Sequence, residues 1–256
     1  MSQPPGLNAP LTLEPGEVHV WYCWTAQCLQ RGLADYYRSL LSAEEKARLL
    51  RFHFEYLQHE YLVTRALCRI TLSRYVQRHP ADWRFRVNAY GRPEIDMPGD
   101  LAPLRFNLSN ARSLVACAIT RSADAGVDVE ETDRPGETVG IADHFFSPTE
   151  VIALQAQPPE RQRQRFFEYW TLKESYIKAR GMGLSIPLEQ FSFDLDQGIR
   201  IRFDPALQDD PDIWQFELHQ PSAQHQLAIG VRCGPRPHAI HVREVVPAPE
   251  LLGAAR

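Results

Sequence analysis

Two lysines and a glutamate stand together in the stretch YWTLKESYIKARGMGL, residues 169–184, and they are the first candidates for chemistry. The chain has 28 lysines and arginines, of which only three are lysines, and Lys173 and Lys178 are two of them. On a helix Glu174 and Lys178 would share one face, with the glutamate first, which is the favoured order. One interpretation is a solvated ion pair worth about 0.2–0.5 kcal/mol. The other is a phosphate site, because a lysine ammonium binds phosphate as a compact point charge.

A second acidic group lies in GVDVEE, residues 126–131. On a strand Asp128 and Glu130 point to the same side, because successive side chains alternate between the two faces. Two carboxylates this close repel each other unless a cation or solvent screens them. A strand end that faces solvent would explain the pair, and a bound divalent cation would explain it equally well. With no histidine or cysteine beside it, such a pair favours a hard ion, Mg²⁺ before Zn²⁺.

A helix and a strand must position these groups. Aromatic and apolar residues recur at helical spacing from about Arg161 to Arg180, and Gly181 suits the position just after a helix end. Residues 126–130 alternate as a strand does. The long helix would therefore carry both lysines and one acid, and the strand would carry the other two acids.

The same order of elements occurs twice along the chain. A capping box, the pattern S-x-x-E that starts helices, occurs at residues 42–45 and again at residues 147–150. Each box is preceded by a strand candidate, at 18–24 or 126–130, and is followed by a long helix and further strand candidates. The first long helix is predicted over Glu55–Gln77.

We therefore predict an α+β fold, a pseudo-twofold duplication of two similar α/β halves. Each half would join a small, mostly antiparallel sheet to one long helix, over residues 1–125 and residues 126–256. The halves would bury their open faces against each other, and a ligand cleft between them is expected. The alternative is that ordinary α+β alternation produces the likeness without any duplication.

Length and composition narrow the class of protein. With 256 residues, 44% hydrophobic and 23% charged, the chain has enough apolar material for a substantial core. A net charge of −4 argues against a general nucleic-acid binder. No apolar run approaches the length of a membrane span, and the first residues lack a secretory pattern. Five cysteines without a CxxC pair suit reduced thiols, so we expect a cytoplasmic protein with no membrane partner.

Other common sites have little support in the sequence. There is no GxGxxG after a strand, and GxxxxGK[ST], GxSxG and HExxH are absent. Among the nine histidines, His238 and His241 in HAIH come nearest to a metal-binding spacing, and a solvated strand is the simpler explanation. Nucleophilic catalysis and zinc chemistry are therefore poorly supported.

Five segments in order resemble the 4′-phosphopantetheinyl transferases of the stand-alone, two-half type typified by the surfactin-synthetase activator. They are LSAEEKARLLRF at 41–52, YGRPEI at 90–95, FNLSN at 106–110, GVDVE at 126–130 with FFSPTE at 145–150, and WTLKESYIK at 170–178 followed by GxG. Each motif alone is common, but their combination in this order is specific.

The resemblance implies a transferase of the holo-[acyl-carrier-protein] synthase type. Such enzymes move the phosphopantetheine arm of coenzyme A to a serine of an apo acyl or peptidyl carrier protein and release adenosine 3′,5′-bisphosphate. The cofactor would be Mg²⁺, and coenzyme A would lie between the halves as co-substrate. The carrier would serve fatty-acid, polyketide or non-ribosomal peptide synthesis. Because one chain holds both halves, we expect a monomer.

The resemblance also implies roles for individual residues. Glu174 would be a metal ligand and the catalytic base, directly or through a metal-bound water, and Lys178 would be a catalytic cation. The metal ligands would be Asp128, Glu130 and Glu174. The coenzyme would contact Arg48, Arg92, Asn107, Ser109, Asn110, Lys173 and Lys178. The first half would thus form the coenzyme A side, and the second half would carry the metal and catalytic motifs.

One position departs from the family pattern. The family usually has a histidine where this chain has Asn110, and an amide can donate to a phosphate oxygen but adds no positive charge. Alternatively, Asn110 caps the turn before the next strand. Two rival functions stay open at this point. One is another Mg²⁺-dependent phosphotransferase or phosphodiesterase, and the other is a non-catalytic module that binds coenzyme A or a carrier.

Overall fold

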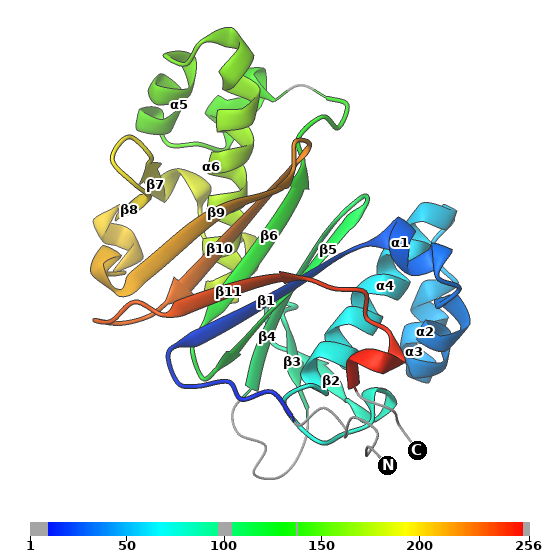
Figure 1. Ribbon diagram of the computed structural model, residues 1–256. Helices are drawn as coiled ribbons and strands as arrows, with labels where there is room; N and C mark the ends of the chain where they lie inside the picture. The colour runs from blue at the N-terminus through cyan, green and yellow to red at the C-terminus, as the bar shows by residue number, and fades with distance from the viewer. Residues whose placement is uncertain (1–9, 97–103, 137, 253–256) are drawn as a thin grey trace, which may run out of the picture. The chain divides into compact units, whose positions relative to one another are not determined.

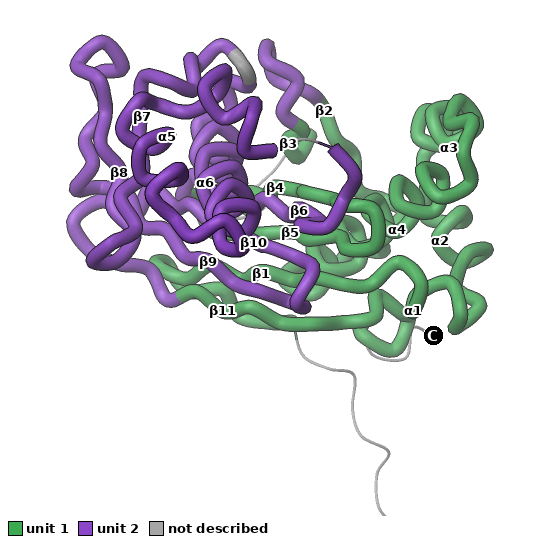
Figure 2. Tube along the Cα trace, turned by 90° about the horizontal axis from the view of Figure 1, so that it is seen from above, with its two compact units in different colours: residues 1–86, 93–122, 240–256 green, residues 87–92, 123–239 purple. Residues whose placement is uncertain are grey.

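The computed structural model describes residues 10–96, 104–136 and 138–252 (Figure 1). Two compact units make up the chain, residues 1–86, 93–122 and 240–256 in the first and residues 87–92 and 123–239 in the second (Figure 2). The predicted division fell after residue 125. The units differ from that division in three segments: residues 240–256 group with the first unit, and residues 87–92 and 123–125 group with the second.

The first unit is built on a four-stranded sheet with the order β11-β1-β5-β4. Its strands are β1 (Glu17–Trp24), β4 (Leu104–Ala111), β5 (Leu114–Arg121) and β11 (Ala239–Glu244). Strand β5 pairs antiparallel with both β1 and β4, and nearly all of its residues are buried. A short hairpin of β2 (Phe85–Val87) and β3 (Pro93–Ile95) completes the strands of this part of the chain.

Helix α4 (Glu55–Leu72) packs on this sheet and supplies much of the first core. The sequence predicted that it would reach Gln77, but it ends at Leu72. The chain turns there because the next side chains bond elsewhere: the Ser73 hydroxyl accepts from the Trp83 indole, and the Tyr75 hydroxyl accepts from the Trp21 indole. The shorter helices of the unit are α1 (Thr25–Gln30), α2 (Ala34–Leu40) and α3 (Ala43–Leu49).

The second unit repeats the plan with a three-stranded antiparallel sheet, β6-β10-β9. Helix α6 packs on β6 and β10, and aromatic side chains dominate the core that it helps to form. The elements are β6 (Ala125–Glu131), α5 (Pro148–Gln155), α6 (Pro159–Arg180), β7 (Phe191–Asp194), β8 (Arg200–Phe203), β9 (Trp214–Ser222) and β10 (His225–Arg232). The predicted α+β class, with one sheet and one long helix in each half, is confirmed.

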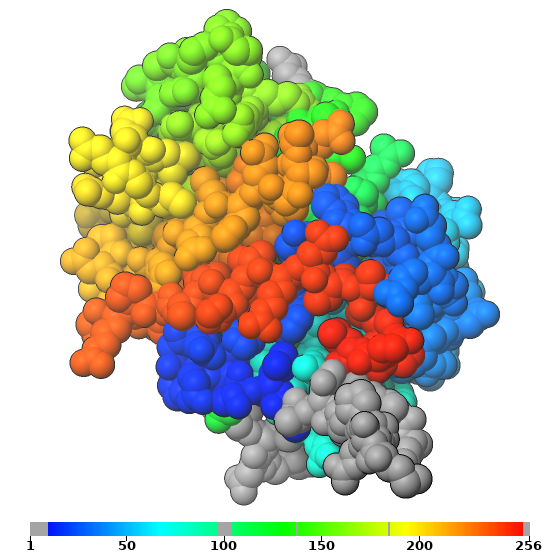
Figure 3. Space-filling model, in the orientation of Figure 1, coloured from blue at the N-terminus to red at the C-terminus, as the bar shows by residue number. Residues whose placement is uncertain are grey.

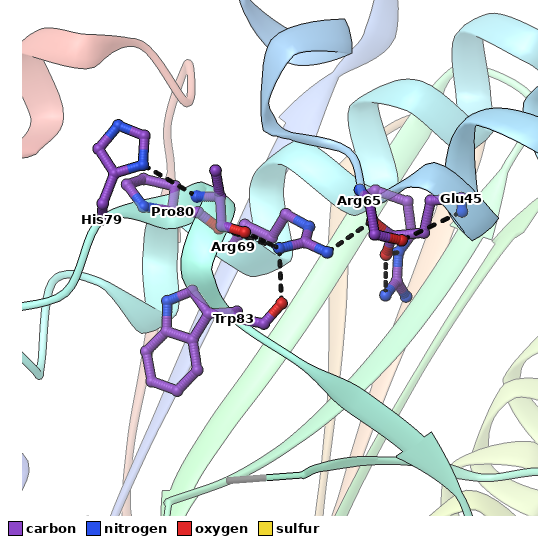
Figure 4. Close-up of polar contacts among 8 residues, drawn as sticks. Glu45, Arg65, Arg69, His79, Pro80 and Trp83 are labelled. Atoms are coloured by element: carbon purple, nitrogen blue, oxygen red, sulfur yellow. Dashed lines mark hydrogen bonds and ion pairs between the residues drawn. The ribbon is translucent and has the colours of Figure 1, made fainter.

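Both predicted capping boxes are present. In α3 the Ser42 hydroxyl accepts from the Glu45 backbone N–H, and the Glu45 carboxylate accepts from the Ser42 backbone N–H. The Glu45 carboxylate also accepts from Arg65 and Arg69 of α4, and Arg69 donates onward to backbone carbonyls near Trp83 (Figure 4). The short helix is thereby fixed to the long one through a buried carboxylate.

The C-terminal segment returns to the start of the chain. Strand β11 lies beside β1 in the sheet, and Val245, Val246, Leu251 and Leu252 pack against the first hydrophobic core. Figure 3 shows these C-terminal residues, in red, against the blue residues of the first helices. Among the described residues, no helix is both long and apolar enough to span a bilayer.

Candidate active site

The predicted acids and Lys178 meet in the second unit, where α6 packs on β6. Asp128 lies in the middle of β6 between two buried valines and is itself only 4% exposed. Helix α6 can approach closely because Gly126 has no side chain: a Cβ there would lie 2.0 Å from the Ser175 carbonyl oxygen. The missing side chain therefore allows the helix to present its residues directly to Asp128.

One face of α6 carries Trp170, Glu174 and Lys178 at intervals of four residues. Lys178 donates from Nζ to Asp128 Oδ1 at 2.6 Å. Burial raises the pKa of Glu174, and the charge of Asp128 raises it further, while Lys178 opposes the shift. A carboxylate shifted in this direction is a stronger base than a solvated one, which is what proton abstraction near neutral pH requires.

Glu130 completes the group from the end of β6. Its Oε1 accepts from the Trp170 indole Nε1 at 3.0 Å, and its Oε2 lies 3.1 Å from Arg134 Nη1. Burial and the charge of Asp128 raise the pKa of Glu130 to about 7, although Arg134 and the indole act against the shift. The sequence analysis missed both partners, although each lies four residues from a predicted site residue and Trp170 stands within the quoted motif.

The donor set suits a hard divalent cation. Three carboxylates without imidazole or thiol favour Mg²⁺. Burial, and after it the charge of Asp128, raises the pKa values of Glu130 and Glu174, and a bound cation would oppose both effects. No choice of one oxygen from each of the three acids brings all three oxygens within 4.8 Å of one another. Among the described residues, the group that meets this condition lies in the first unit. Holding one ion would therefore require at least one acid side chain to rotate.

Lys173 lies apart from this group. It is 1% exposed, and its ammonium forms an ion pair with Glu150 at 2.8 Å. The same nitrogen donates to the backbone carbonyls of Leu188 and Phe191 at 2.8 and 2.6 Å. Burial lowers the pKa of Lys173, and Glu150 counteracts the shift. Glu150 belongs to the capping box of α5, so this lysine holds two helices and the start of β7 together.

Comparison with known proteins places the chain in a family. A family model described as the 4′-phosphopantetheinyl transferase superfamily matches residues 124–231. A 4′-phosphopantetheinyl transferase of Bacillus subtilis is 37% identical over 167 residues, which cover 65% of this chain and 72% of that protein. The chain belongs to the 4′-phosphopantetheinyl transferase superfamily. Two further 4′-phosphopantetheinyl transferases are similar to the chain. Sfp of Bacillus subtilis strain 168 is 37% identical over a match that covers 63% of this chain and 69% of that protein. HetI of a Nostoc species is 33% identical over a match that covers 68% of this chain and 73% of that protein.

The resemblance inferred from the sequence motifs is thereby confirmed, and the chain is a phosphopantetheinyl transferase enzyme. The segment matched by the family model contains all three acids and Lys178.

In this phosphopantetheinyl transferase, Arg92 also lies in the second unit, at the C-terminal end of α6. Its Nη1 donates to the Ala179 carbonyl at 3.1 Å and lies 3.8 Å from Asp124 Oδ1. The guanidinium fills the space beside Gly181, which has the left-handed φ of 65° expected after a helix end. Asn88 secures the same turn by donating to the Gly181 carbonyl. The prediction that Gly181 ends this helix is confirmed.

The other predicted coenzyme contacts belong to the first unit. Arg48 is exposed on α3, with its guanidinium 5.6 Å from the centre of the Tyr61 ring. Asn107 and Ser109 are buried residues of β4. Asn110 is an exposed residue of the same strand, and its amide donates to Glu60 on α4. Asn110 therefore bonds across to a helix, a contact that neither of the two interpretations of this residue predicted.

A cavity of about 250 Å³ lies beside the acids in the second unit. Its wall is mainly apolar, and it includes Arg134 and Trp170, the two residues that contact Glu130. The remaining lining residues are Pro135, Gly136, Thr138, Ile141, Phe145 and Phe166. The cavity therefore adjoins Glu130 through both of its side-chain partners.

Proposed function

We propose that the protein transfers the phosphopantetheine arm of coenzyme A to a serine of an apo carrier protein, through the acids around Asp128. The observation that carries the proposal is the shared environment of these acids. Burial and then the charge of Asp128 raise the pKa of both Glu130 and Glu174, while the carboxylate of Asp128 itself pairs with Lys178. This is a partly buried anionic group with a cation beside it, in a chain whose family performs this transfer.

Glu174 is the residue we propose as the general base. The serine oxygen bonds to the phosphorus next to the pantetheine, and the bond from that phosphorus to the adenosine bisphosphate oxygen breaks. The serine proton passes to Glu174, and adenosine 3′,5′-bisphosphate leaves with the bonding electrons. The raised pKa of Glu174 supports this role, because the carboxylate then accepts a proton more readily than a solvated one.

Asp128, Glu130 and Glu174 would hold Mg²⁺, which when bound supplies positive charge to the pyrophosphate of coenzyme A. Lys178 is the proposed phosphate-binding cation, since its ammonium stands at the edge of the acidic group and its side chain is 26% exposed. Lys173 is left out of this role, because its ammonium is buried and bonded to Glu150 and two carbonyls. Its proposed role is structural.

Arg48, Arg92, Asn107, Ser109 and Asn110 keep their proposed roles as coenzyme A contacts, on the strength of the family motifs. Guanidinium, amide and hydroxyl groups can all donate hydrogen bonds to phosphate oxygens. We further propose a cytoplasmic enzyme, which its free cysteines support, and a monomer, since one chain supplies both halves. The partners are coenzyme A and an apo acyl or peptidyl carrier domain, with neither nucleic acid nor membrane involved.

The test is a transfer assay with the full chain. The enzyme is incubated with coenzyme A, Mg²⁺ and an apo carrier domain, and mass spectrometry follows the carrier. We expect the carrier to gain one phosphopantetheine and adenosine 3′,5′-bisphosphate to appear in equal amount. A carrier whose acceptor serine is replaced by alanine should gain nothing, and a chelator should stop the reaction. Release of a nucleotide product without any carrier would instead favour a different phosphotransferase or phosphodiesterase.

A further inference from the structure

A second cluster of metal-binding side chains lies in the first unit, away from the acids on β6. Glu17 and His19 point to the same face of β1, because they are two residues apart on a strand. His241 comes from β11, the neighbouring strand in the sheet. One ligand atom from each of the three residues can be chosen so that all lie within 4.8 Å of one another.

We propose that Glu17, His19 and His241 form a site for Zn²⁺ or a similar borderline divalent ion. The Glu17 carboxylate lies beside both rings, with Oε2 at 3.5 Å from His19 Nε2 and Oε1 at 3.9 Å from His241 Nε2, and the two ring centres are 5.3 Å apart. Tetrahedral bonds of about 2.1 Å separate neighbouring ligand atoms by roughly 3.4 Å, so small side-chain shifts would bring these donors onto one ion. Two imidazoles and one carboxylate leave a fourth position for water.

A second layer of contacts already orients the buried ligand. His19 Nδ1 lies 2.8 Å from the Tyr75 hydroxyl, which also accepts from the Trp21 indole at 2.8 Å. When Nε2 binds a metal, Nδ1 carries the ring proton and can donate it to the Tyr75 oxygen. Metal-binding histidines usually have such a partner on the other nitrogen, because it fixes the tautomer and the ring orientation.

The charges around the cluster are mixed. The positive neighbour is Arg243, whose charge acts on His19. Its guanidinium is 5.5 Å from the centre of the Trp21 ring, so it has an aromatic partner. Glu17 supplies a negative charge beside both rings. Because two of the three donors are imidazoles, the cluster should prefer Zn²⁺ to Mg²⁺, the reverse of the preference of the three acids in the second unit.

The consequence would be structural. Glu17 and His19 lie near the start of the described chain, and His241 lies near its end, on strands that are neighbours. An ion bound to all three would cross-link these strands and stabilise the folded first unit by mass action. The site is independent of the proposed transfer chemistry, so binding can be measured without any assay of activity.

The experiment uses the full chain after removal of metals with a chelator, in excess Mg²⁺ to occupy the acids of the second unit. Zn²⁺ is titrated by calorimetry, and thermal unfolding is followed with and without it. We expect one equivalent to bind and to raise the melting temperature. His241→Ala should weaken binding at least about tenfold and remove the thermal gain, since one of three protein ligands is lost.

His144→Ala is the matched control. His144 is an exposed histidine whose Nε2 lies 3.9 Å from Asp143, and it belongs to no three-ligand group among the described residues. This variant should bind Zn²⁺ like the unaltered protein. Glu17→Gln is a second test of Zn²⁺ binding, because it removes a ligand on β1 and leaves β11 unaltered.

Co²⁺ substitution reports the ligand type, because thiolate ligation produces a strong sulfur-to-cobalt charge-transfer band. We expect that band to be absent. Three results would each overturn the proposed site: Zn²⁺ binding that does not saturate, Zn²⁺ binding that His241→Ala and Glu17→Gln both leave unchanged, or a thiolate band.

Discussion

The two units use the same device to join a short helix to a long one, but they use it with different cations. In the first unit the capping-box residue Glu45 pairs with Arg65 and Arg69 of α4 (Figure 4). In the second unit the capping-box residue Glu150 pairs with Lys173 of α6. Each of these carboxylates is buried, and each pairing fixes the start of one helix to the side of another.

The second unit has a further ion pair, which lies outside its capping box. Lys178 pairs with Asp128, and the charge of Asp128 raises the pKa of two further acids. By contrast, the two arginines beside Glu45 hold the pKa of that carboxyl below its ordinary value, although burial acts to raise it. We infer that the repeated pairs, in which cations fully match the carboxylate, maintain the fold. The unbalanced group around Asp128, in which acids outnumber cations, is the one that we infer performs the chemistry.

The largest expected effect separates the two lysines of α6. Lys173→Met removes the cation from a buried pair and leaves Glu150 charged in the interior, which typically costs about 3–5 kcal/mol of stability. Lys178→Met also leaves a buried carboxylate, Asp128, without its cation, but it should lose less stability because Lys178 itself reaches solvent and water can replace its ammonium; it should slow transfer strongly. Urea denaturation of both variants measures the difference. Equal stability of the two variants would show that the pair with Glu150 does not hold the helices together.

Glu174→Gln tests the chemistry assigned to the unbalanced group. The amide keeps the size of the side chain but cannot accept the serine proton, and it is a poorer ligand for Mg²⁺. Loss of one acid–base or electrostatic group typically costs on the order of a hundredfold in rate. We expect that loss in the transfer assay, with an unchanged circular dichroism spectrum and a urea midpoint no lower than that of the unaltered protein, because the neutral amide removes a partly buried carboxylate whose pKa is raised. A folded variant with near-normal activity would show that Glu174 is not the catalytic base.

Glu130→Gln tests whether burial and the charge of Asp128 make an ionised Glu130 costly to the folded protein. The pKa of Glu130 is raised to about 7 in the folded protein, so between its ordinary value and pH 7 the unfolded chain releases a proton that the folded protein retains. The stability contributed by protonated Glu130 is therefore present at low pH and is lost as pH rises toward about 7. The neutral amide removes this dependence.

In chelator, the variant should thus gain about 1–2 kcal/mol over the unaltered protein between mildly acidic and mildly alkaline pH. This figure is smaller than the full shift would give, because Arg134 and solvent partly screen the charge. Urea titrations of both proteins across this pH range measure the gain. A stability difference that does not change with pH would mean that Glu130 ionises normally.

Local patterns in the sequence predicted a large part of this structure. The two capping boxes, the end of α6 at Gly181 and the strand β6 each depend on neighbours along the chain, and all three are present. The role of Lys173 could not be predicted, because it depends on what packs on each face of α6. Lys173 and Lys178 are five residues apart, so they point in different directions from the helix.

Contacts between distant segments could not be predicted from the sequence for a related reason. Alternation predicts that β1 and β11 are strands but does not show that they are neighbours, so His19 and His241 could not be paired in advance. The close packing of α6 on β6 has the same origin. Gly126 was part of a recognised motif, but its purpose is visible only once the helix lies against it.

The smallest expected effect returns to the first unit and to Asn110. Its amide donates to Glu60, a residue of α4 whose pKa is raised by burial, with the Asn110 bond acting against the shift. Suppose that a coenzyme A phosphate also lies within reach of this position, as the family motif implies. A histidine there would face two anions, which would both raise its pKa. Its charge would help binding below that pKa and would be lost as pH rises through it.

Asn110→His should therefore tighten coenzyme A binding several-fold at mildly acidic pH, with the gain shrinking toward alkaline pH. The magnitude follows from charge-assisted hydrogen bonds, which exceed neutral ones by about 1 kcal/mol. Glu60 competes for the new charge, so Glu60→Gln combined with Asn110→His should enlarge the gain if the phosphate is present. Calorimetric titration of coenzyme A into the three proteins at two pH values decides the matter. An affinity ratio that is the same at both pH values would assign Asn110 to Glu60 alone, a contact that holds β4 to α4 without reaching the coenzyme.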